Sequence, residues 1–479
     1  MKTLTKSKYL AGLESNAYLW TMVNDPEKIP LPDMATQDRF DEGHIVGELA
    51  KKLYPEGVDL SNLDFIENIE KTKEVVKKNK IIFEAGFMKD RCFARIDILI
   101  PNEEGFDLVE VKSSSKVKKI HYEDLAFQKH VAEMCSLVIK NVYVYHLNKE
   151  YERKGELIVE NLFAKTDVTP EVNSIFEVDL RIKNMLKIID LPSCPSFDFK
   201  DIPKSEYGNL FVDEFLTNLP EGNIFELYLI RKTKAVKLYE EGIQLIKDLP
   251  GNTKLNHKQQ IQIKAQEQTY IDKKKIEEFV NGLQEPVIHM DFESYSEAVP
   301  SFDKVRPYQH LPFQYSIHIE TKNGLDHKEF LYEGKEDPRK NFIENLIKDL
   351  PTKGSILVYH ESYEVSKLKE IARDLPEYQE DIKKIILRIQ DLKTPFSEFW
   401  YHDKKQKGSN SIKKVLPLFS KKTHKGLIIQ NGSDAMIIYK KNKNKLTPEL
   451  KKDLLDYCEL DTKAMVIILK NLKNLVWLI

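Results

Sequence analysis

The sequence predicts an α/β protein in which two α/β regions flank a helical segment. In residues 1–189, apolar runs of strand length alternate with stretches of helical period. Residues 190–285 carry mainly the helical period, and the alternation resumes over 286–479. A chain of 479 residues ordinarily forms more than one domain, so we expect each α/β region to fold as a domain.

Composition narrows the class of protein. Hydrophobic residues make up 41% of the chain, which is enough for globular cores. No segment has the pattern of a signal peptide or a membrane-spanning helix, so we expect a cytoplasmic protein without a membrane partner. The net charge of −2 gives no global positive field for nucleic acid. The four scattered cysteines lack a CxxC pair, which argues against a disulfide framework or a zinc ribbon.

The first region begins with a helix that ends at a proline, followed by three strands. The turn-like sequence PNEEG separates the last two of these strands. A helix and a fourth strand complete a compact α/β core. The predicted elements are a helix over 40–55, strands over 81–88, 94–100 and 106–112, a helix over 122–139 and a strand over 142–147.

Charged side chains interrupt two of these strands. Asp97 lies in the apolar run ARIDILI, and Glu110 and Lys112 share one face of FDLVEVK. If the strands pair as a hairpin, Asp97 and Glu110 can bind one metal ion, while Lys112 orients a water and stabilises charge on a phosphate. Arg95 can contact the phosphodiester, and Gln128 faces the same region if its helix packs back across the strands. The alternative is an exposed, salt-bridged hairpin.

This pattern resembles the PD-(D/E)XK nuclease superfamily, and more closely its RecB-like branch. The resemblance rests on the helix DEGHIVGELA, the Asp in RIDIL, the strand EVK and the helix DLAFQ. It implies a metal-dependent nuclease whose site contains Asp97, Glu110, Lys112 and Gln128. It leaves one further ligand open among His44, Glu48 and Glu84.

Relatives in that branch often carry an iron–sulfur cluster, which needs four thiolates. Here Ser15 and Asn16 stand where a Cys-Pro pair would be expected, and only Cys194 remains of the later cysteine group. We therefore expect no iron–sulfur cluster.

Beyond the first region, the predicted elements are helical and then alternate again. Amphipathic helices are expected over 225–249 and 270–283, with PGNTKLNHKQQIQ as a break between them. Strands are expected over 287–294, 313–320 and 355–360, and a long helix over 447–472.

Asp291 and Glu293 form a second acidic pair, on one face of the predicted strand VIHMDFES. Two like charges on a half-buried strand cost energy unless a cation neutralises them or one stays protonated. Carboxylate ligands favour Mg²⁺ or Mn²⁺ over zinc. Tyr457 and Asp461 lie four apart on the last helix and therefore share a face. The alternative is an exposed edge strand whose outward face is acidic, with Tyr457 as a core residue and Asp461 as a surface acid.

The DxE strand and the late YxxxD helix resemble the DEDDy exonucleases of the DnaQ-like, RNase H-like fold. Their middle motif, Asn-x-x-aromatic-Asp, corresponds to His360, Tyr363 and Glu364. The resemblance implies 3′-to-5′ trimming that releases a nucleoside monophosphate, with Tyr457 positioning the attacking water. Asp391 is a reserve ligand or supports one. Lys413 and Lys414 are expected to be solvated, the alternative being phosphate contact. The implied ligands of two divalent ions are Asp291, Glu293, Glu364 and Asp461.

Together the two resemblances cover nearly the whole chain. The chain resembles a poorly characterised bacterial family of proteins in which the two kinds of nuclease domain are fused. They imply a RecB-like nuclease domain at 1–189, a helical connecting region at 190–285 and a DnaQ-like exonuclease domain at 286–479. The implied protein is a Mg²⁺- or Mn²⁺-dependent nuclease with DNA a more suitable partner than RNA, serving repair or phage defence. Two alternatives remain open. Either only the DEDDy site works, on RNA or single-stranded DNA, or the chain is a non-catalytic nucleic-acid-binding subunit.

Overall fold

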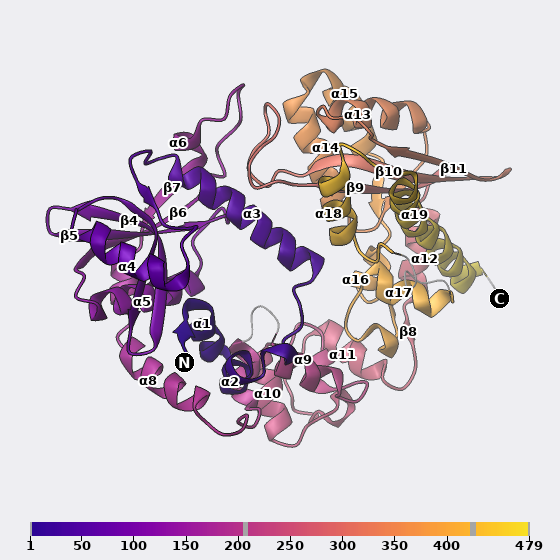
Figure 1. Cartoon of the computed structure of the whole chain (residues 1–479). Coiled ribbons are helices and arrows are strands. Elements are labelled where there is room, and N and C mark those ends of the chain that lie inside the picture. The colour runs from indigo at the N-terminus through magenta and orange to yellow at the C-terminus, as the bar shows by residue number, and fades with distance from the viewer. Residues whose placement is uncertain (1, 205–208, 422–427, 478–479) are drawn as a thin grey trace. The chain divides into compact units, whose positions relative to one another are not determined.

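The computed structural model describes residues 2–204, 209–421 and 428–477. The chain forms two compact units, both of mixed α/β structure (Figure 1). The predicted segment 190–285 is divided between them. Among the described residues, every helix is too short or too polar to cross a bilayer. The first unit comprises Met1–Asn218 and Glu297–Tyr308, and the second comprises Leu219–Ser296 and Gln309–Ile479.

A seven-stranded sheet with the order β2-β3-β4-β5-β6-β7, in which β1 pairs with β4, forms the centre of the first unit. β3, β4 and β5 are antiparallel, and β6 joins β5 in parallel because α5 (Lys119–Met134) carries the chain back along the sheet. This confirms the predicted order of three strands, helix and strand. The strands are β1 (Leu4–Thr5), β2 (Val58–Asp59), β3 (Ile82–Lys89), β4 (Cys92–Asn102), β5 (Gly105–Lys112), β6 (Ile139–Leu147) and β7 (Phe163–Asp167).

Helices of the first unit bury one face of this sheet. Ile96 of β4 and Leu108 of β5 lie in one apolar cluster with Phe127 and Val131 of α5. The helices are α1 (Lys6–Glu14), α2 (Asn16–Asn24), α3 (Met34–Lys51), α4 (Phe65–Val76), α5 (Lys119–Met134), α6 (Val159–Leu162), α7 (Thr169–Asn173), α8 (Val178–Ile189) and α9 (Leu210–Thr217), with 3₁₀ turns at Pro26–Lys28 and Phe199–Lys204.

The main sheet of the second unit has the order β11-β10-β9-β12-β13. β11, β10 and β9 are antiparallel, whereas β12 and β13 run parallel to β9. The predicted strands near 287, 313 and 355 are confirmed, while β11 was not predicted because its residues are mostly polar. The strands are β8 (Tyr270–Ile271), β9 (Val287–Tyr295), β10 (Leu311–Thr321), β11 (Gly324–Leu331), β12 (Ile356–Val358), β13 (Ile389–Asp391) and β14 (Tyr401–His402).

The prediction of one helix over 225–249 is wrong. The chain instead forms 3₁₀ turns at Ile224–Glu226 and Ile246–Asp248 around α10, and Gly242 at φ 87° follows α10 with a backbone angle that favours glycine. The other helices are α10 (Lys232–Glu240), α11 (His257–Lys264), α12 (Lys273–Asn281), α13 (Pro338–Asp349), α14 (Glu361–Asp374), α15 (Gln379–Ile386), α16 (Thr394–Ser397), α17 (Ile412–Phe419), α18 (Gly432–Asn442) and α19 (Pro448–Trp477), with 3₁₀ turns at Pro376–Tyr378 and Lys404–Gln406.

The register of β9 and β10 separates an apolar face of the sheet from a polar one. Met290 lies opposite Ile317, and both belong to the core that α13 and α14 cover. Asp291 lies opposite Ser316, whose hydroxyl is 2.7 Å from that of Thr462 on α19. The helix α19 therefore packs over a sheet face that carries polar side chains.

Candidate functional site

Three carboxylates meet where α19 crosses β9. Asp291 and Glu293 point to the same side of β9, and Asp461 approaches them from α19. Each residue offers one carboxylate oxygen, and these oxygens lie within 4.8 Å of one another. This acid cluster, Asp291, Glu293 and Asp461, has the spacing and the oxygen chemistry that Mg²⁺ or Mn²⁺ requires.

The acid cluster lies in a pocket with a volume of about 400 Å³. The middle motif contributes to the same pocket, although Glu364 does not belong to the group of three close carboxylates. Lys413 also lines the pocket, and its side chain is exposed as expected. The lining includes Asp291, Glu293, Ser294, His310, Tyr359, His360, Tyr363, Glu364, Lys413, Gly432, Tyr457 and Asp461.

Burial and mutual repulsion dominate the electrostatics of the acid cluster. Burial, followed by the charges of Asp461 and Glu293, raises the pKa of Asp291 well above its usual value. Burial and Asp461 likewise raise the pKa of Glu293, against a lowering effect from Lys413. Burial and the same carboxylates raise the pKa of Tyr457, so its hydroxyl stays protonated and can donate a hydrogen bond. A divalent cation would relieve this repulsion.

His310 and Ser294 form a polar wall of the pocket that the sequence did not indicate. The Ser294 hydroxyl lies 2.5 Å from the Tyr363 hydroxyl and 2.9 Å from His310 Nδ1. Burial, helped by Lys367, lowers the pKa of His310 to about 4, so the ring is neutral at pH 7. Neither residue belongs to a recognisable sequence motif. His310 reaches the pocket only because β10 returns beside β9.

Asp391 holds the start of α14 rather than reaching the acid cluster. Its carboxylate accepts hydrogen bonds from the backbone N–H groups of His360 (3.0 Å), Glu361 (3.2 Å) and Lys393 (2.8 Å). His360 has φ 97°, a left-handed conformation that costs energy for a non-glycine residue. Asp391 thus fixes the turn from which Glu364 projects.

We expect Asp391→Ala to lower the free energy of unfolding by about 2 kcal/mol, since capping carboxylates typically contribute about 1 kcal/mol and this one accepts three bonds. Asp391→Asn should lose less stability because the side-chain oxygen of Asn still accepts hydrogen bonds. Urea unfolding followed by circular dichroism measures both. Equal stability of wild type and Asp391→Ala would show that these contacts do not hold α14.

Glu364 gives the metal-free protein a pH dependence of stability. Its Oε2 is buried without a hydrogen-bond partner among the described residues, and burial raises its pKa from 4.5 to about 8. A carboxyl with a higher pKa in the folded state binds more protons when folded, so its contribution to stability falls as pH rises from about 4.5 to about 8.

Glu364→Gln should therefore gain stability over wild type by about 3 kcal/mol between about pH 5 and pH 8, because one pKa unit corresponds to about 1.4 kcal/mol. Urea unfolding in EDTA at several pH values gives this difference. Glu361→Gln, at an exposed position in the same helical turn, is the matched control and should follow the wild-type curve. A pH-independent difference for Glu364→Gln would contradict the raised pKa.

In the first unit, three of the predicted site residues, Glu110, Lys112 and Gln128, contact one another. Glu110 is 1% exposed and lies at the centre of an ion-pair cluster with Lys6, Lys112, Asp124 and Gln128. Lys112 Nζ lies 2.5 Å and Lys6 Nζ 2.7 Å from Glu110 Oε1, and Gln128 Nε2 donates to Glu110 Oε2 at 2.7 Å. Burial alone would raise the pKa of Glu110, but the two lysines overcome this effect and lower it.

Asp97 lies beside this cluster without joining a triad of close metal-ligating groups in the described residues. Its carboxylate accepts a hydrogen bond of 2.7 Å from the Val111 N–H, and burial together with Glu110 raises its pKa to about 7. Lys6, which was not predicted as a site residue, contacts Glu110 and so supplies positive charge that a metal ion would otherwise supply. The acid cluster of the second unit fits a divalent ion better.

The candidates for a further ligand have other partners or lie exposed. Glu48 pairs with Lys51 at 2.6 Å, and His44 is exposed on α3. Glu84 pairs with Arg95 at 2.7 Å, so the guanidinium expected to meet a phosphodiester is held by an acid. Two acids of α3 that were not predicted as ligands, Asp38 and Glu42, are buried, and Glu42 Oε2 accepts a 2.9 Å hydrogen bond from the Ala298 N–H.

Comparisons with known proteins match parts of the chain. A family model for a domain of unknown function, DUF2779, matches residues 288–411. This range contains both acids of β9 but ends before α19. A Mycoplasma pneumoniae protein, "Uncharacterized protein MG366 homolog", is 27% identical over 220 residues, which are 40% of this chain and 33% of that protein. The chain thus matches about a third of that relative's length. No solved structure matches.

Proposed function

We propose that the chain is a metal-dependent nuclease that hydrolyses DNA phosphodiester bonds, with exonucleolytic trimming by the second unit. The observation that carries this proposal is the acid cluster: three carboxylates within 4.8 Å, on the wall of a pocket of about 400 Å³, with a protonated tyrosine beside them. Buried carboxylates with raised pKa values in a pocket mark functional sites.

The topology of both units supports the proposal by resemblance. Three antiparallel strands followed by two parallel ones, in the order β11-β10-β9-β12-β13, are similar to the RNase H-like sheet of DnaQ-like exonucleases. In the first unit, an antiparallel meander followed by α5 and a parallel β6 is similar to the PD-(D/E)XK core. Resemblance of fold alone does not assign chemistry, which depends on the side chains at the site.

The described residues suit a phosphodiester substrate. Asp291, Glu293 and Asp461 would hold Mg²⁺ or Mn²⁺, which supply positive charge to the scissile phosphate and lower the pKa of a water. Tyr457 would keep its proton and donate a hydrogen bond to the attacking water or to a phosphate oxygen. Lys413, whose ammonium donates to the Gln430 carbonyl at 2.6 Å, adds positive charge at the pocket. Glu364 is the proposed fourth carboxylate, and the released product would be a nucleoside monophosphate from a 3′ end.

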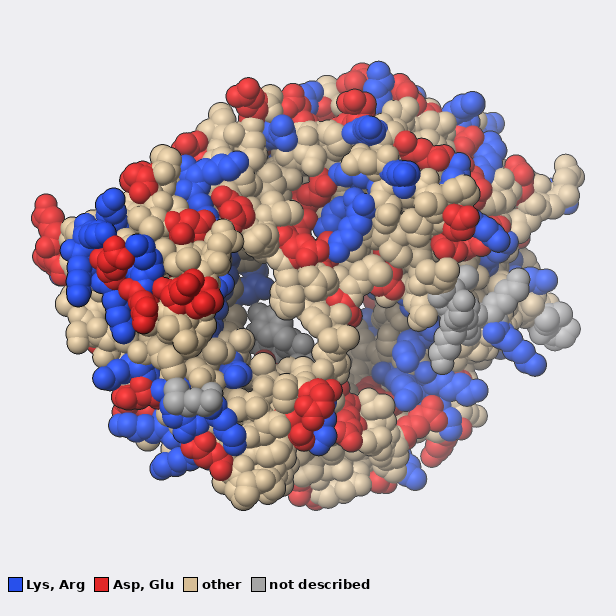
Figure 2. All heavy atoms as spheres, viewed as in Figure 1, with Lys and Arg blue, Asp and Glu red and all other residues tan. Residues whose placement is uncertain are grey.

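The ion pairs of the first unit favour a second candidate function. Because Lys6 and Lys112 both contact Glu110, this carboxylate is already neutralised without a metal ion. In the second candidate only the second unit would hydrolyse its substrate, RNA or single-stranded DNA, and the first unit would grip it. On the face of the molecule in Figure 2, Lys and Arg lie interspersed with Asp and Glu, in keeping with the net charge of −2. Substrate grip would then depend on local lysines rather than on a global field.

Degradation of end-labelled single- and double-stranded DNA and RNA, with Mg²⁺, with Mn²⁺ and with EDTA, tests the proposal. We expect DNA shortened progressively from its 3′ end in the presence of either ion and no cleavage in EDTA. Cleavage of RNA or single-stranded DNA alone would favour the second candidate. Binding without cleavage of any substrate would instead indicate a nucleic-acid-binding subunit.

A further inference from the structure

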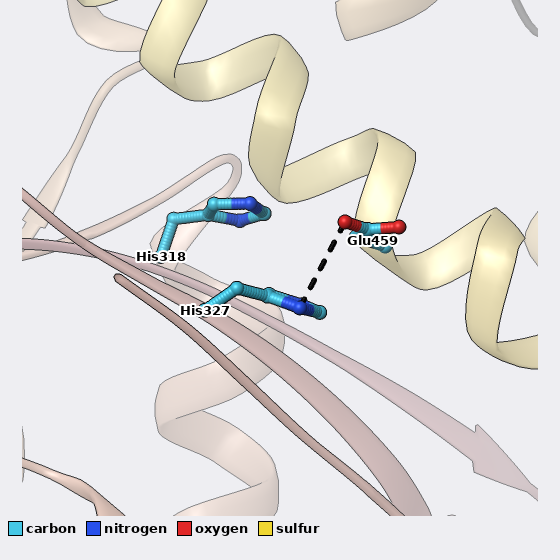
Figure 3. A group of neighbouring side chains, drawn as sticks. All are labelled: His318, His327 and Glu459. Atoms are coloured by element: carbon cyan, nitrogen blue, oxygen red, sulfur yellow. Dashed lines mark ion pairs between the residues drawn. The ribbon is translucent and has the colours of Figure 1, made fainter. Parts of the chain in front are cut away.

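A second group of metal-ligating side chains lies beside α19 and contains histidine (Figure 3). His318 of β10 and His327 of β11 are directly opposite each other in the antiparallel ladder, and their rings stack with centroids 4.4 Å apart. Glu459 of α19 faces them. Each of the three residues offers one ligand atom, and these atoms lie within 4.8 Å of one another.

Hydroxyl groups hold both imidazole rings in position. His318 Nδ1 lies 2.8 Å from Thr462 Oγ1, and His327 Nε2 lies 3.0 Å from Ser316 Oγ. The two hydroxyls are themselves 2.7 Å apart and buried. One nitrogen of each ring is therefore occupied, which leaves His318 Nε2 and His327 Nδ1 for another partner. Bonds of this kind orient histidine ligands in metal sites.

The separation between His327 and Glu459 suits an ion better than a direct bond. His327 Nδ1 lies 3.8 Å from Glu459 Oε1, which is longer than a hydrogen bond. Zinc binds imidazole nitrogen and carboxylate oxygen at about 2.0–2.2 Å each, so two ligand atoms of a tetrahedral zinc lie about 3.4 Å apart, which is about 0.4 Å less than the separation here. Lys463 now pairs with Glu459, and an ion would compete with this ammonium.

We propose that His318, His327 and Glu459 bind a Zn²⁺ ion. Two imidazoles and one carboxylate favour zinc, in contrast to the all-oxygen acid cluster, which favours Mg²⁺ or Mn²⁺. The ion would join α19 to β10 and β11, and so stabilise the helix that carries Tyr457 and Asp461. The proposal does not depend on nuclease activity, because none of its three ligands belongs to the acid cluster.

Metal binding to the EDTA-treated full chain tests the site, with Zn²⁺ affinity measured by competition against a chromophoric chelator and Co²⁺ used as a spectroscopic probe. The background is Asp291→Asn with Glu293→Gln, which removes the oxygen-rich cluster as a competing site. We expect one Zn²⁺ per chain in this background and a Co²⁺ absorption spectrum typical of a four-coordinate site with nitrogen ligands, water being the fourth ligand.

His327→Gln should weaken Zn²⁺ binding at least tenfold and remove the Co²⁺ spectrum, since a lost ligand costs no less than a lost supporting bond. Lys463→Met, at a partly exposed position that should not disturb folding, should strengthen binding because the competing ammonium is gone. His257→Gln, at an exposed histidine of the same unit, is the matched control. No binding in the background, or equal affinity of His327→Gln and His257→Gln, would overturn the proposal.

Discussion

Asp291→Asn combined with Glu293→Gln is expected to lower metal-dependent hydrolysis by about 10³-fold or more. Two of the three proposed ligands in the acid cluster are replaced by neutral amides, and bound metal ions contribute several kcal/mol of transition-state stabilisation, at about 1.4 kcal/mol for each factor of ten. The measurement is the initial rate of release from a 3′-end-labelled DNA substrate in Mg²⁺ or Mn²⁺.

The same double variant should be at least as stable as wild type when no metal is present. Burial and mutual repulsion raise the pKa values of both carboxyls, so neutral amides remove an unfavourable interaction. Loss of activity with retained thermal stability therefore separates a chemical effect from unfolding. Asp326→Asn with Glu329→Gln makes the same chemical changes at exposed positions of β11 and should keep full activity. An active Asp291→Asn/Glu293→Gln variant would place hydrolysis elsewhere in the chain.

The acid cluster could be anticipated from sequence because local periodicity encodes most of it. The period of two along β9 aligns Asp291 with Glu293, and the helical period aligns Tyr457 with Asp461. Their meeting across the chain was expected from a resemblance, not from the spacing itself. Asp391 was expected to be a reserve ligand or to support one. The structure shows a carboxylate that accepts hydrogen bonds from three backbone N–H groups, a role that requires β13 beside the start of α14.

Other features depend on contacts that no local pattern encodes. Lys6 reaches Glu110 across 104 positions of sequence, and one lysine in a lysine-rich chain carries no distinguishing signal. His318 and His327 become neighbours only through the pairing of β10 with β11, a strand whose polar composition concealed it. The wrong helix prediction over 225–249 shows that a local pattern can also mislead. The amphipathic period continues past Gly242, but the backbone turns at this glycine and α10 ends before it.

Glu110→Gln is expected to lower the free energy of unfolding by about 3 kcal/mol. Removing one partner of a buried ion pair leaves the other charge uncompensated, which costs about 3–5 kcal/mol, and the lower end applies because Lys6 and Lys112 remain partly exposed. Urea unfolding of the full chain measures the loss. Glu104→Gln is the matched control. Glu104 is an exposed acid in the turn between β4 and β5, and its ion pair with Lys140 lies at the surface, where such pairs contribute little to stability.

Lys6→Met separates an ion-pair cluster from a metal site. Lys112 and Gln128 still contact Glu110 in this variant, so the loss of stability should be smaller than in Glu110→Gln. If the first unit is a nuclease domain whose cation site Lys6 blocks, Mn²⁺ should raise the melting temperature of Lys6→Met more than that of wild type, because ligands stabilise the state that binds them. If Mn²⁺ affects both proteins equally while Glu110→Gln is destabilised, the cluster is structural and hydrolysis belongs to the second unit alone.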